Sequence, residues 1–266
     1  MNLNVDYAGV MELMRMTRPI IFNETAVESV SEKGLDNFVT QVDVGVQEFL
    51  QNRLLDRYPG IQFMGEEKKN EIDFTKPCWI LDPIDGTTNL IHHYQFSAVS
   101  LALYAEGEIV FGAVYNPFLE NMFHAVRGEG AYLDGKRIRV TEADTLADSL
   151  IAVGTAPYQK EYAKENFRIF ENIFLKSQDI RRTGSAELEL CYIAAGRHEG
   201  FFERILQPWD YAAGLVIVEE AGGTVTDWDG NALDVRTAHP VVASNGRIHE
   251  ELRRELVRSH EIQVRG

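Results

Sequence analysis

The chain has 266 residues, enough for one large domain or for two small ones that share a core. Asp and Glu total 41 against 26 Lys and Arg, and the net charge of −15 disfavours nonspecific binding to nucleic acid or to an anionic membrane. No apolar run reaches the roughly 18 residues that span a bilayer, and no basic region with an apolar segment opens the sequence, so we expect a cytoplasmic protein. Cys78 and Cys191 adjoin apolar runs, which predicts buried thiols rather than a disulfide.

The first third of the sequence predicts two helices with an irregular segment between them. Residues 6–22 have apolar positions at helical spacing, and Pro19 is expected to kink this helix or end it early. Residues 23–35 are polar and irregular, which predicts a mobile flap. A second helix runs to about Tyr58 and begins near Asp43, where a carboxylate can cap unpaired amides.

A short strand over residues 61–64 runs into Gly65-Glu66-Glu67. Adjacent glutamates are usually solvated surface. Here they lie directly after a strand end and a glycine, which is where ligands collect in layered α/β folds.

The stretch Trp79–Leu90, Trp-Ile-Leu-Asp-Pro-Ile-Asp-Gly-Thr-Thr-Asn-Leu, begins as a buried strand and stops at once in turn-forming residues. Asp82 and Asp85 lie on this stiff turn, and two carboxylates about 4 Å apart repel by roughly 4 kcal/mol at an effective dielectric of 20. A proton, a basic partner or a hard cation such as magnesium, manganese or calcium would relieve this. The amides of Gly86 and Thr87 can accept an anion. An acidic loop capped by its own hydroxyls is the alternative that this stretch leaves open.

The middle of the chain predicts an antiparallel meander with no functional signal. Three strands are expected over residues 96–104, 109–115 and 122–125, followed by a hairpin over 127–140 with Asp134-Gly135 at its turn.

The last part mixes strands and helices. Strands are expected over residues 149–154, 199–203, 224–227 and 240–244, and helices over 161–175, from 185 to about 196, from 208 to about 222, and from about 249. The helix over 161–175 carries Phe167, Phe170 and Phe174 on one side. Gly184 and Ser185 suit contacts to phosphate or hydroxyl groups, and equally a plain N-cap. The mixture favours a layered α+β or α/β architecture.

Five acidic residues lie at the ends of predicted elements: Asp43, Glu66, Asp82, Asp85 and Asp210. Carboxylates at such ends can converge on one cleft. Lys68 and Lys69 follow Glu66, but two lysines do not neutralise five convergent acids, so a divalent metal is the better hypothesis.

The chain resembles the inositol monophosphatase family of magnesium-dependent, lithium-sensitive phosphatases. The matching blocks stand in the family's order between about residues 6 and 258: Asn37–Asp43, Gly65–Glu67, Trp79–Asn89, Arg182–Ala186, Ala194–Arg197 and Trp209–Gly214. The resemblance implies one unit over residues 1–266 with alternating helix and sheet layers, as in inositol monophosphatase and fructose-bisphosphatase, usually in a homodimer. It is loosely divisible into a metal-binding α+β half, 1–145, and an α/β half, 146–266.

The resemblance also implies roles for individual residues. The first magnesium would be held by Glu66, Asp82 and the carbonyl of Ile84, and the second by Asp82, Asp85 and Asp210. Glu66 would reach a third, weaker magnesium site through waters. The catalytic set is Asp43, Glu66 and Thr87, in which Asp43 and the Thr87 hydroxyl orient and deprotonate the attacking water. The substrate-binding set is Asp85, Gly86, Thr87, Gly184, Ser185 and Glu203.

The implied activity is hydrolysis of inositol monophosphate and similar small polyol phosphates by a metal-activated water. The alternatives are a relative acting on adenosine 3',5'-bisphosphate, fructose 1,6-bisphosphate, histidinol phosphate or NADP. Such substrates need extra basic or aromatic lining, for which Arg181, Arg182 and Arg204 are candidates. A third hypothesis is a regulatory binding protein that keeps the fold, because some family relatives touch the transcription apparatus.

Three departures from the family's pattern bear on substrate choice. Glu187 stands where the family more often has a small residue, and we expect it to line or rim the pocket. Asn37 replaces an aspartate that often heads the first block. The segment 91–95 lacks the family's usual glycine and proline, and His92 and His93 within it fit a surface loop better than a ligand contact.

Overall fold

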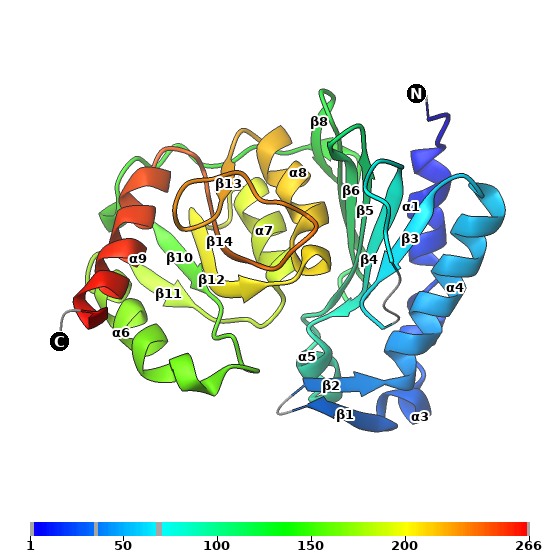
Figure 1. Ribbon diagram of the computed structural model, residues 1–266, viewed down its shortest axis with the longest axis horizontal. Coiled ribbons are helices and arrows are strands. Elements are labelled where there is room, and N and C mark those ends of the chain that lie inside the picture. Colours follow the sequence, from blue (N-terminus) through cyan, green and yellow to red (C-terminus); the bar gives the residue numbers. More distant parts are fainter. Residues whose placement is uncertain (1–2, 35–36, 68–70, 265–266) are drawn as a thin grey trace.

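The computed structural model describes residues 3–34, 37–67 and 71–264. Helices and sheets alternate in layers: an outer helix layer, a seven-stranded sheet, a central helix pair, a five-stranded sheet and a second outer helix pair (Figure 1). This arrangement confirms the predicted layered fold class. No helix within the described ranges combines the length and the apolar character that crossing a bilayer requires.

The seven-stranded sheet follows the order β3-β4-β5-β6-β7-β8-β9. Its strands are β3 (Gln62–Gly65), β4 (Cys78–Asp85), β5 (Ala98–Ala105), β6 (Glu108–Asn116), β7 (Asn121–Val126), β8 (Gly130–Leu133) and β9 (Lys136–Arg137). β3 pairs with β4 in parallel, and each later pair is antiparallel. The predicted meander and its hairpin are therefore confirmed.

One face of this sheet is covered by α1 (Tyr7–Arg15) and α4 (Gln41–Arg57) (Figure 1). The short helices α2 (Arg18–Ile21) and α3 (Glu24–Val27) pack against α4. Apolar residues of α4 pack in the same buried cluster as Trp79 and Leu81 of β4. The helix predicted over 6–22 is in fact two helices, because the helical conformation is interrupted before Pro19. Pro19 lies in the first turn of α2, where its missing N–H costs nothing.

The prediction of an irregular flap over residues 23–35 was wrong for its described part. Besides α3, it contains β1 (Val30–Gly34), which pairs antiparallel with β2 (Asn37–Thr40). The main-chain groups of this polar segment are thus used in a ladder, which periodicity of apolar residues does not reveal. Leu35 lies outside the described residues, as do Lys68 and Lys69.

The five-stranded sheet follows the order β11-β10-β12-β14-β13. Its strands are β10 (Leu150–Val153), β11 (Asp179–Arg181), β12 (Gly200–Leu206), β13 (Thr224–Thr226) and β14 (His239–Ser244). β10 runs parallel to β11 and β12, whereas β14 is antiparallel to both of its neighbours. The two sheets draw their strands from opposite sides of residue 145, and the loose division of the chain at that point stays a prediction.

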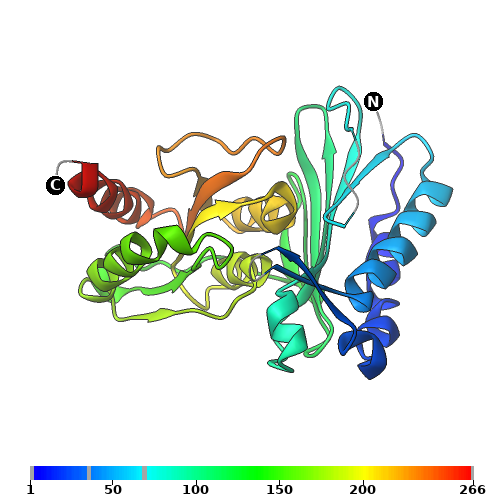
Figure 2. The same ribbon diagram turned by 60° about the horizontal axis from the view of Figure 1, so that its bottom comes forward.

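The outer helices of this half are α6 (Ala163–Phe174) and α9 (His249–Val264), at the opposite end of the molecule from α1 and α4 (Figures 1 and 2). α6 buries Ile169, Phe170 and Ile173. Phe167 and Phe174 are 65% and 51% exposed, so the expected apolar face was wrong in two of its three members. The stripe that packs is set by Ile169 and Ile173, one turn apart.

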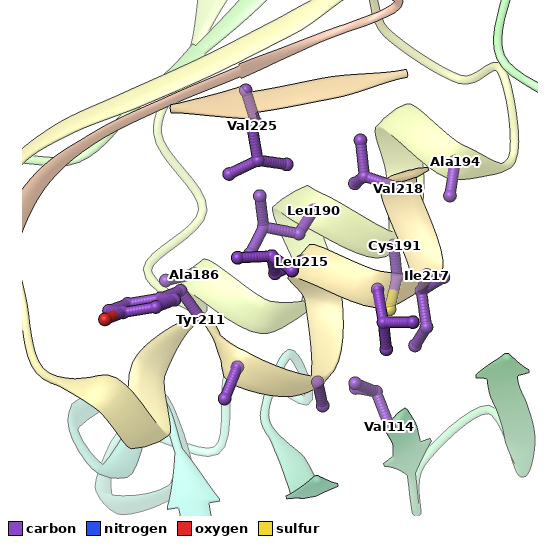
Figure 3. Close-up of a cluster of buried hydrophobic side chains, with 14 of the residues drawn as sticks. Val114, Ala186, Leu190, Cys191, Ala194, Tyr211, Leu215, Ile217, Val218 and Val225 are labelled. Atoms are coloured by element: carbon purple, nitrogen blue, oxygen red, sulfur yellow. The ribbon is translucent and has the colours of Figure 1, made fainter. Parts of the chain in front are cut away.

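The central pair consists of α7 (Ala186–Ala194) and α8 (Ala212–Glu220), both packed between the sheets. Figure 3 shows Leu190 and Cys191 of α7 beside Ile217 and Val218 of α8, with Val114 of β6 across from them. Cys191 is a buried free thiol, as is Cys78, which confirms that prediction. Short single-turn elements complete the chain: α5 (Thr87–Ile91), η1 (Leu146–Asp148), η2 (Lys160–Tyr162) and η3 (Pro208–Asp210).

Close contact between β6 and α8 depends on Gly112. A Cβ atom at this position would lie 2.5 Å from the Ala213 carbonyl oxygen and 2.6 Å from a Val216 methyl group. We therefore expect Gly112→Ala to destabilise the protein by about 1–3 kcal/mol, as overpacking of a core does. Urea unfolding measures this.

Gly60→Ala is the matched control, because a Cβ at Gly60 meets nothing within 4 Å. Both changes remove a glycine from the unfolded chain. Equal unfolding free energies for the two variants would show that β6 and α8 are not in tight contact at Gly112.

Candidate active site

An irregularity in β4 brings Asp82 and Asp85 to the same side of the sheet. Asp82 pairs with Ser100 and Asp85 pairs with Ala98, so β4 has one more residue than β5 between these two pairs. Three residues along a regular strand would place the two side chains on opposite faces, and the extra residue cancels that alternation. The predicted turn after Leu81 is thus a bulged continuation of the strand to Asp85. Pro83 is tolerated at such a bulge because no ladder bond is needed there.

Gly86 ends β4 and reverses the chain. It has φ 91° and ψ 44°, a left-handed conformation that favours glycine, and it stands at the start of α5. A Cβ here would lie 3.0 Å from the Gly184 carbonyl oxygen and 3.2 Å from that of Phe96. The turn therefore lies directly against the loop that carries Gly184.

Asp43 and Thr87 lie far apart in sequence and meet in a hydrogen bond. The Thr87 hydroxyl is 2.9 Å from Asp43 Oδ1 and 3.1 Å from the Ile84 carbonyl oxygen, so it can donate to either. Asp43 Oδ2 accepts the Thr40 N–H at 2.8 Å and the Thr40 hydroxyl at 2.6 Å, which caps α4. Burial raises the pKa of Asp43, while these donors lower it. Asp43 therefore serves both as a cap and as the partner of Thr87.

Asp85 is held by the first turn of α7. Its Oδ2 accepts the Ser185 hydroxyl at 2.5 Å and the Glu187 N–H at 2.8 Å, and its Oδ1 accepts the Ala186 N–H at 3.2 Å. Burial raises the pKa of Asp85 to about 6, although the donors oppose this rise.

One cavity of about 100 Å³ gathers side chains from both sheets. Its acidic lining comes from five elements or loops and consists of Glu66, Asp82, Asp85, Glu189, Glu203 and Asp210. Among the lining residues that the structure describes, Arg182 alone is basic. Like charges are therefore concentrated where little water can screen them.

The carboxylates raise one another's proton affinity. The pKa of Asp82 is raised by burial first and then by Glu66, Asp85 and Asp210. The pKa of Asp210 is likewise raised by burial and by Glu66, and the Gln207 N–H opposes this at 2.7 Å from its Oδ2. Burial raises the pKa of Glu203 to about 7. A cation in the cavity would favour the ionised forms of all of these groups.

The donor atoms fit a hard divalent cation in chemical type. Glu66, Asp82, Ile84, Asp85 and Asp210 all line the cavity and offer carboxylate or carbonyl oxygens. Within the described ranges, however, no group of three or more histidine, cysteine, aspartate or glutamate side chains is already arranged to hold a metal ion. Main-chain N–H groups already donate to Asp82, Asp85 and Asp210, so an ion would compete with these hydrogen bonds for the carboxylates.

The cavity gathers nearly all of the residues that the sequence singled out. Its lining includes Glu66, Asp82, Ile84, Asp85, Gly86, Thr87, Gly184, Ser185, Glu203 and Asp210. Asp43 lies behind Thr87 rather than on the cavity wall. Sequence reasoning missed Glu189 and Tyr158, which also line the cavity. Neither belongs to a recognisable motif, since Glu189 lies within a helix and Tyr158 lies in a loop.

Glu187 does not rim the cavity, contrary to expectation. It is fully buried, and its carboxylate accepts the Ala213 N–H at 3.1 Å and the Gly214 N–H at 2.6 Å at the start of α8. Its main-chain N–H donates to Asp85, whereas its carboxylate is bound to α8 and does not line the cavity. Because the partners of Glu187 lie on α8, far along the chain, the residues around Glu187 in the sequence do not indicate this contact.

The remaining candidates separate clearly. Arg182 lines the cavity, but Arg181 pairs with Asp179 at 2.5 Å, and Arg204 is buried against Glu165 at 2.8 Å. His92 and His93 are exposed and do not line the cavity. The side chain of Asn37 lies outside what the structure describes.

A profile of the "Inositol monophosphatase family" matches residues 3–261. "Inositol-1-monophosphatase" of Rhizobium meliloti is 38% identical over 239 residues, which are 89% of this chain and 89% of that protein. "Nus factor SuhB" of Escherichia coli K12 is 40% identical over 225 residues, which are 84% of this chain and 83% of that protein.

Solved structures are similar over almost the whole chain. The extragenic suppressor protein suhB of Bartonella henselae has a TM-score of 0.88 at 36% identity and covers 95% of this chain and 98% of its own. IMPase-II of Staphylococcus aureus with inositol monophosphate bound has a TM-score of 0.83 at 29% identity, over 97% of this chain and 98% of its own. The same protein with 2'AMP bound has a TM-score of 0.82 at 30% identity, over 97% of each chain.

The raised pKa values predict how stability depends on pH. Asp85 and Glu203 titrate at about 6 and about 7 in the folded protein, above the ordinary values near 4 of an unfolded chain. Between about pH 4 and pH 7 the folded state therefore binds more protons than the unfolded state does. The contribution of these two groups to the free energy of unfolding is fully present below about pH 4 and is lost as the pH rises to about 7. We expect the Tm in EDTA to fall from about pH 5 to about pH 8, and Mg²⁺ to raise Tm more at about pH 8.

Asp210→Asn sharpens this test, because an amide oxygen can still accept the Gln207 N–H while the charge is removed. The variant should melt higher than wild type in EDTA at about pH 8 and respond less to Mg²⁺. Asp148→Asn, at an exposed cap outside the cavity, is the control and should behave as wild type. A Mg²⁺ response that is equal at both pH values and in all three proteins would contradict the prediction.

Proposed function

The chain belongs to the inositol monophosphatase family, and from this membership we propose that it is a Mg²⁺-dependent phosphomonoesterase acting on inositol monophosphate and similar small polyol phosphates. The observation that carries the proposal is the single cavity that joins Glu66 after β3 and the acidic residues of β4 and η3 to the turn at Gly86. The inositol monophosphate complex of the Staphylococcus aureus relative supports the choice of substrate. The 2'AMP complex of that relative adds nucleoside 2'-monophosphates as a second substrate class.

In this proposal Glu66, Asp82 and the Ile84 carbonyl hold one Mg²⁺, and Asp82, Asp85 and Asp210 hold a second. Glu66 reaches a third, weaker site through waters. The ions, when bound, supply a lowered pKa for water and neutralise charge on the phosphoryl oxygens. The fit rests on oxygen donors of the right type around one cavity, as hard cations require.

Thr87 and Asp43 are the proposed pair that prepares the attacking water. When the Thr87 hydroxyl donates to Asp43 Oδ1, its oxygen keeps lone pairs that can accept a hydrogen bond from a water in the cavity. Burial raises the pKa of Asp43, which makes its carboxylate a better base. The proton of the water can thus pass to Thr87 as the proton of Thr87 passes to Asp43.

The substrate is proposed to lie between the Gly86 turn and the loop at Gly184. The amides of Gly86 and Thr87 bind the phosphate, and Asp85, Gly184, Ser185 and Glu203 bind the alcohol part. The water oxygen bonds to phosphorus while the ester P–O bond breaks. The electron pair of the broken bond leaves with the alcohol oxygen, which takes up a proton. Positioning provides most of the protein's own contribution.

The family resemblance adds properties that belong to the same proposal. We propose that lithium inhibits the enzyme, that the protein forms a homodimer and that it is located in the cytoplasm. Nucleic acid and membranes are not among the proposed partners, because the net charge of −15 opposes binding to anionic surfaces.

A regulatory role is the second candidate, favoured by the Escherichia coli relative that carries the name Nus factor. In that case phosphatase activity would be incidental to binding. Co-purification with the transcription apparatus that survives chelation of magnesium and the Asp85→Asn substitution would support this role over catalysis.

The first test is a panel of phosphate esters with purified protein. We expect Mg²⁺-dependent phosphate release from inositol 1-phosphate, and we expect Asp85→Asn to lower kcat/KM at least about a hundredfold because charge stabilisation is lost. Asp134→Asn, in the hairpin turn between β8 and β9, is the control that should retain activity. No phosphate release, with Asp85→Asn indistinguishable from wild type, would reject the proposal, and a panel led by a bisphosphate would favour the alternative substrates.

The second test concerns the Thr87–Asp43 pair. Thr87→Ala and Asp43→Asn should each lower kcat by about 10²–10⁴ with little change in KM, as loss of acid–base catalysis does. The double variant should be no worse than the poorer single one, because the two residues act as a unit. Thr145→Ala removes a comparable Thr–Asp pair, with Thr145 Oγ1 at 2.8 Å from Asp148, far from the cavity and should leave kcat unchanged. Strictly additive losses would speak against the relay.

A further inference from the structure

Tyr158 is an aromatic side chain that borders the acidic cavity and is still open to solvent. It lines the cavity together with Pro157 and Gly154, yet 51% of its surface is exposed. Glu66, Asp82, Asp210 and Glu203 lie close enough to act on its hydroxyl electrostatically. The ring thus spans from the carboxylates to the mouth of the cavity, a place that none of the proposed catalytic or metal-binding roles uses.

The loop that carries Tyr158 is fastened on three sides. The Ala156 N–H donates to Glu203 Oε1 at 2.8 Å, and Asn166 Nδ2 donates to the Thr155 carbonyl oxygen at 3.2 Å. Arg182 Nη2 donates to the Thr155 hydroxyl at 3.1 Å. Because these anchors come from β12, α6 and the loop before α7, the ring is presented from a fixed support, as a binding platform requires.

A half-exposed aromatic ring beside a phosphate site can recognise the flat part of a substrate. Stacking of a base on an aromatic side chain depends on the π-face and therefore tolerates any base. In a nucleoside 2'-monophosphate, the base and the phosphate are on neighbouring ribose carbons. Both the phosphate cradle at Gly86 and the ring of Tyr158 belong to the same small cavity, so the two groups can be engaged together.

We propose that Tyr158 is a specificity-determining residue whose ring stacks against the base of nucleoside 2'-monophosphates and favours them over phosphate esters that carry no aromatic base. This inference rests on the proposed phosphatase function and deepens it. The phenol hydroxyl is not needed for the stacking, and the polyol phosphates do not depend on the ring. Tyr158→Phe and Tyr158→Ala separate these contributions.

The experiment measures kcat/KM for 2'-AMP and for glycerol 2-phosphate with Mg²⁺ in wild type and in both variants. We expect Tyr158→Ala to lower kcat/KM for 2'-AMP about tenfold, mainly through KM, and to change glycerol 2-phosphate less than about twofold. Tyr158→Phe should stay within about twofold of wild type on both esters. Tyr94→Ala is the matched control, because Tyr94 is 62% exposed but does not line the cavity.

Equal losses on both esters in Tyr158→Ala would overturn the inference, as would a loss in Tyr158→Phe as large as in Tyr158→Ala. Hydrolysis of glycerol 2-phosphate without hydrolysis of 2'-AMP by wild type would also overturn it while leaving the proposed function intact. If neither ester is hydrolysed, the proposed function fails and calorimetric binding of 2'-AMP still decides the role of the ring. An unchanged Kd in Tyr158→Ala, with an unchanged Tm, would then exclude stacking.

Discussion

The mutual repulsion of buried carboxylates is the constraint on which this structure depends. Burial raises the pKa of Asp82, Asp85 and Asp210, and the charge of Asp85 adds to the rise at both Asp82 and Asp210. Such a cluster lowers the stability of the metal-free protein, because burying like charges is costly. Its presence in a packed fold is consistent with the cation proposed above, since functional sites are where proteins accept local strain.

The fold manages this repulsion by giving each carboxylate its own main-chain donors. Asp82 accepts the Ile84 N–H at 2.9 Å within the bulge, and Asp85 accepts two N–H groups at the start of α7. Asp210 accepts the Gln207 N–H across η3. Bulges, caps and helix starts supply unpaired N–H groups and also end an element at the surface of a cleft. The same local geometry therefore both holds an acid and exposes it.

This link explains what the sequence could predict. Asp43 was found because it stands at a predicted helix start, and Glu66 and Asp82 because polar residues directly after strands are a local signal. The layered fold followed from the mixture of strand and helix periods. Residues whose role is fixed by a distant partner gave no such signal. The helix expected from Pro208 breaks at Tyr211, which is fully buried, and the mostly polar residues 30–34 form a strand that pairs with β2. Tertiary packing, which the sequence pattern does not show, likewise decides that Ile169 is buried and Phe167 is not.

Glu187 shows how far such a distant partner can matter. Its N–H donates to Asp85, and its carboxylate accepts the N–H groups of Ala213 and Gly214. A Cβ at position 214 would lie 2.6 Å from Glu187 Oε2, so the helix must approach closely to make these bonds. One buried residue therefore ties Asp85 to the start of α8, the helix that directly follows Asp210. Asp85 and Asp210 repel each other, and the directed hydrogen bonds of Glu187 resist their separation better than a neutral packing contact would. The buried carboxylate of Glu187 therefore helps to hold the two sides of the cavity together.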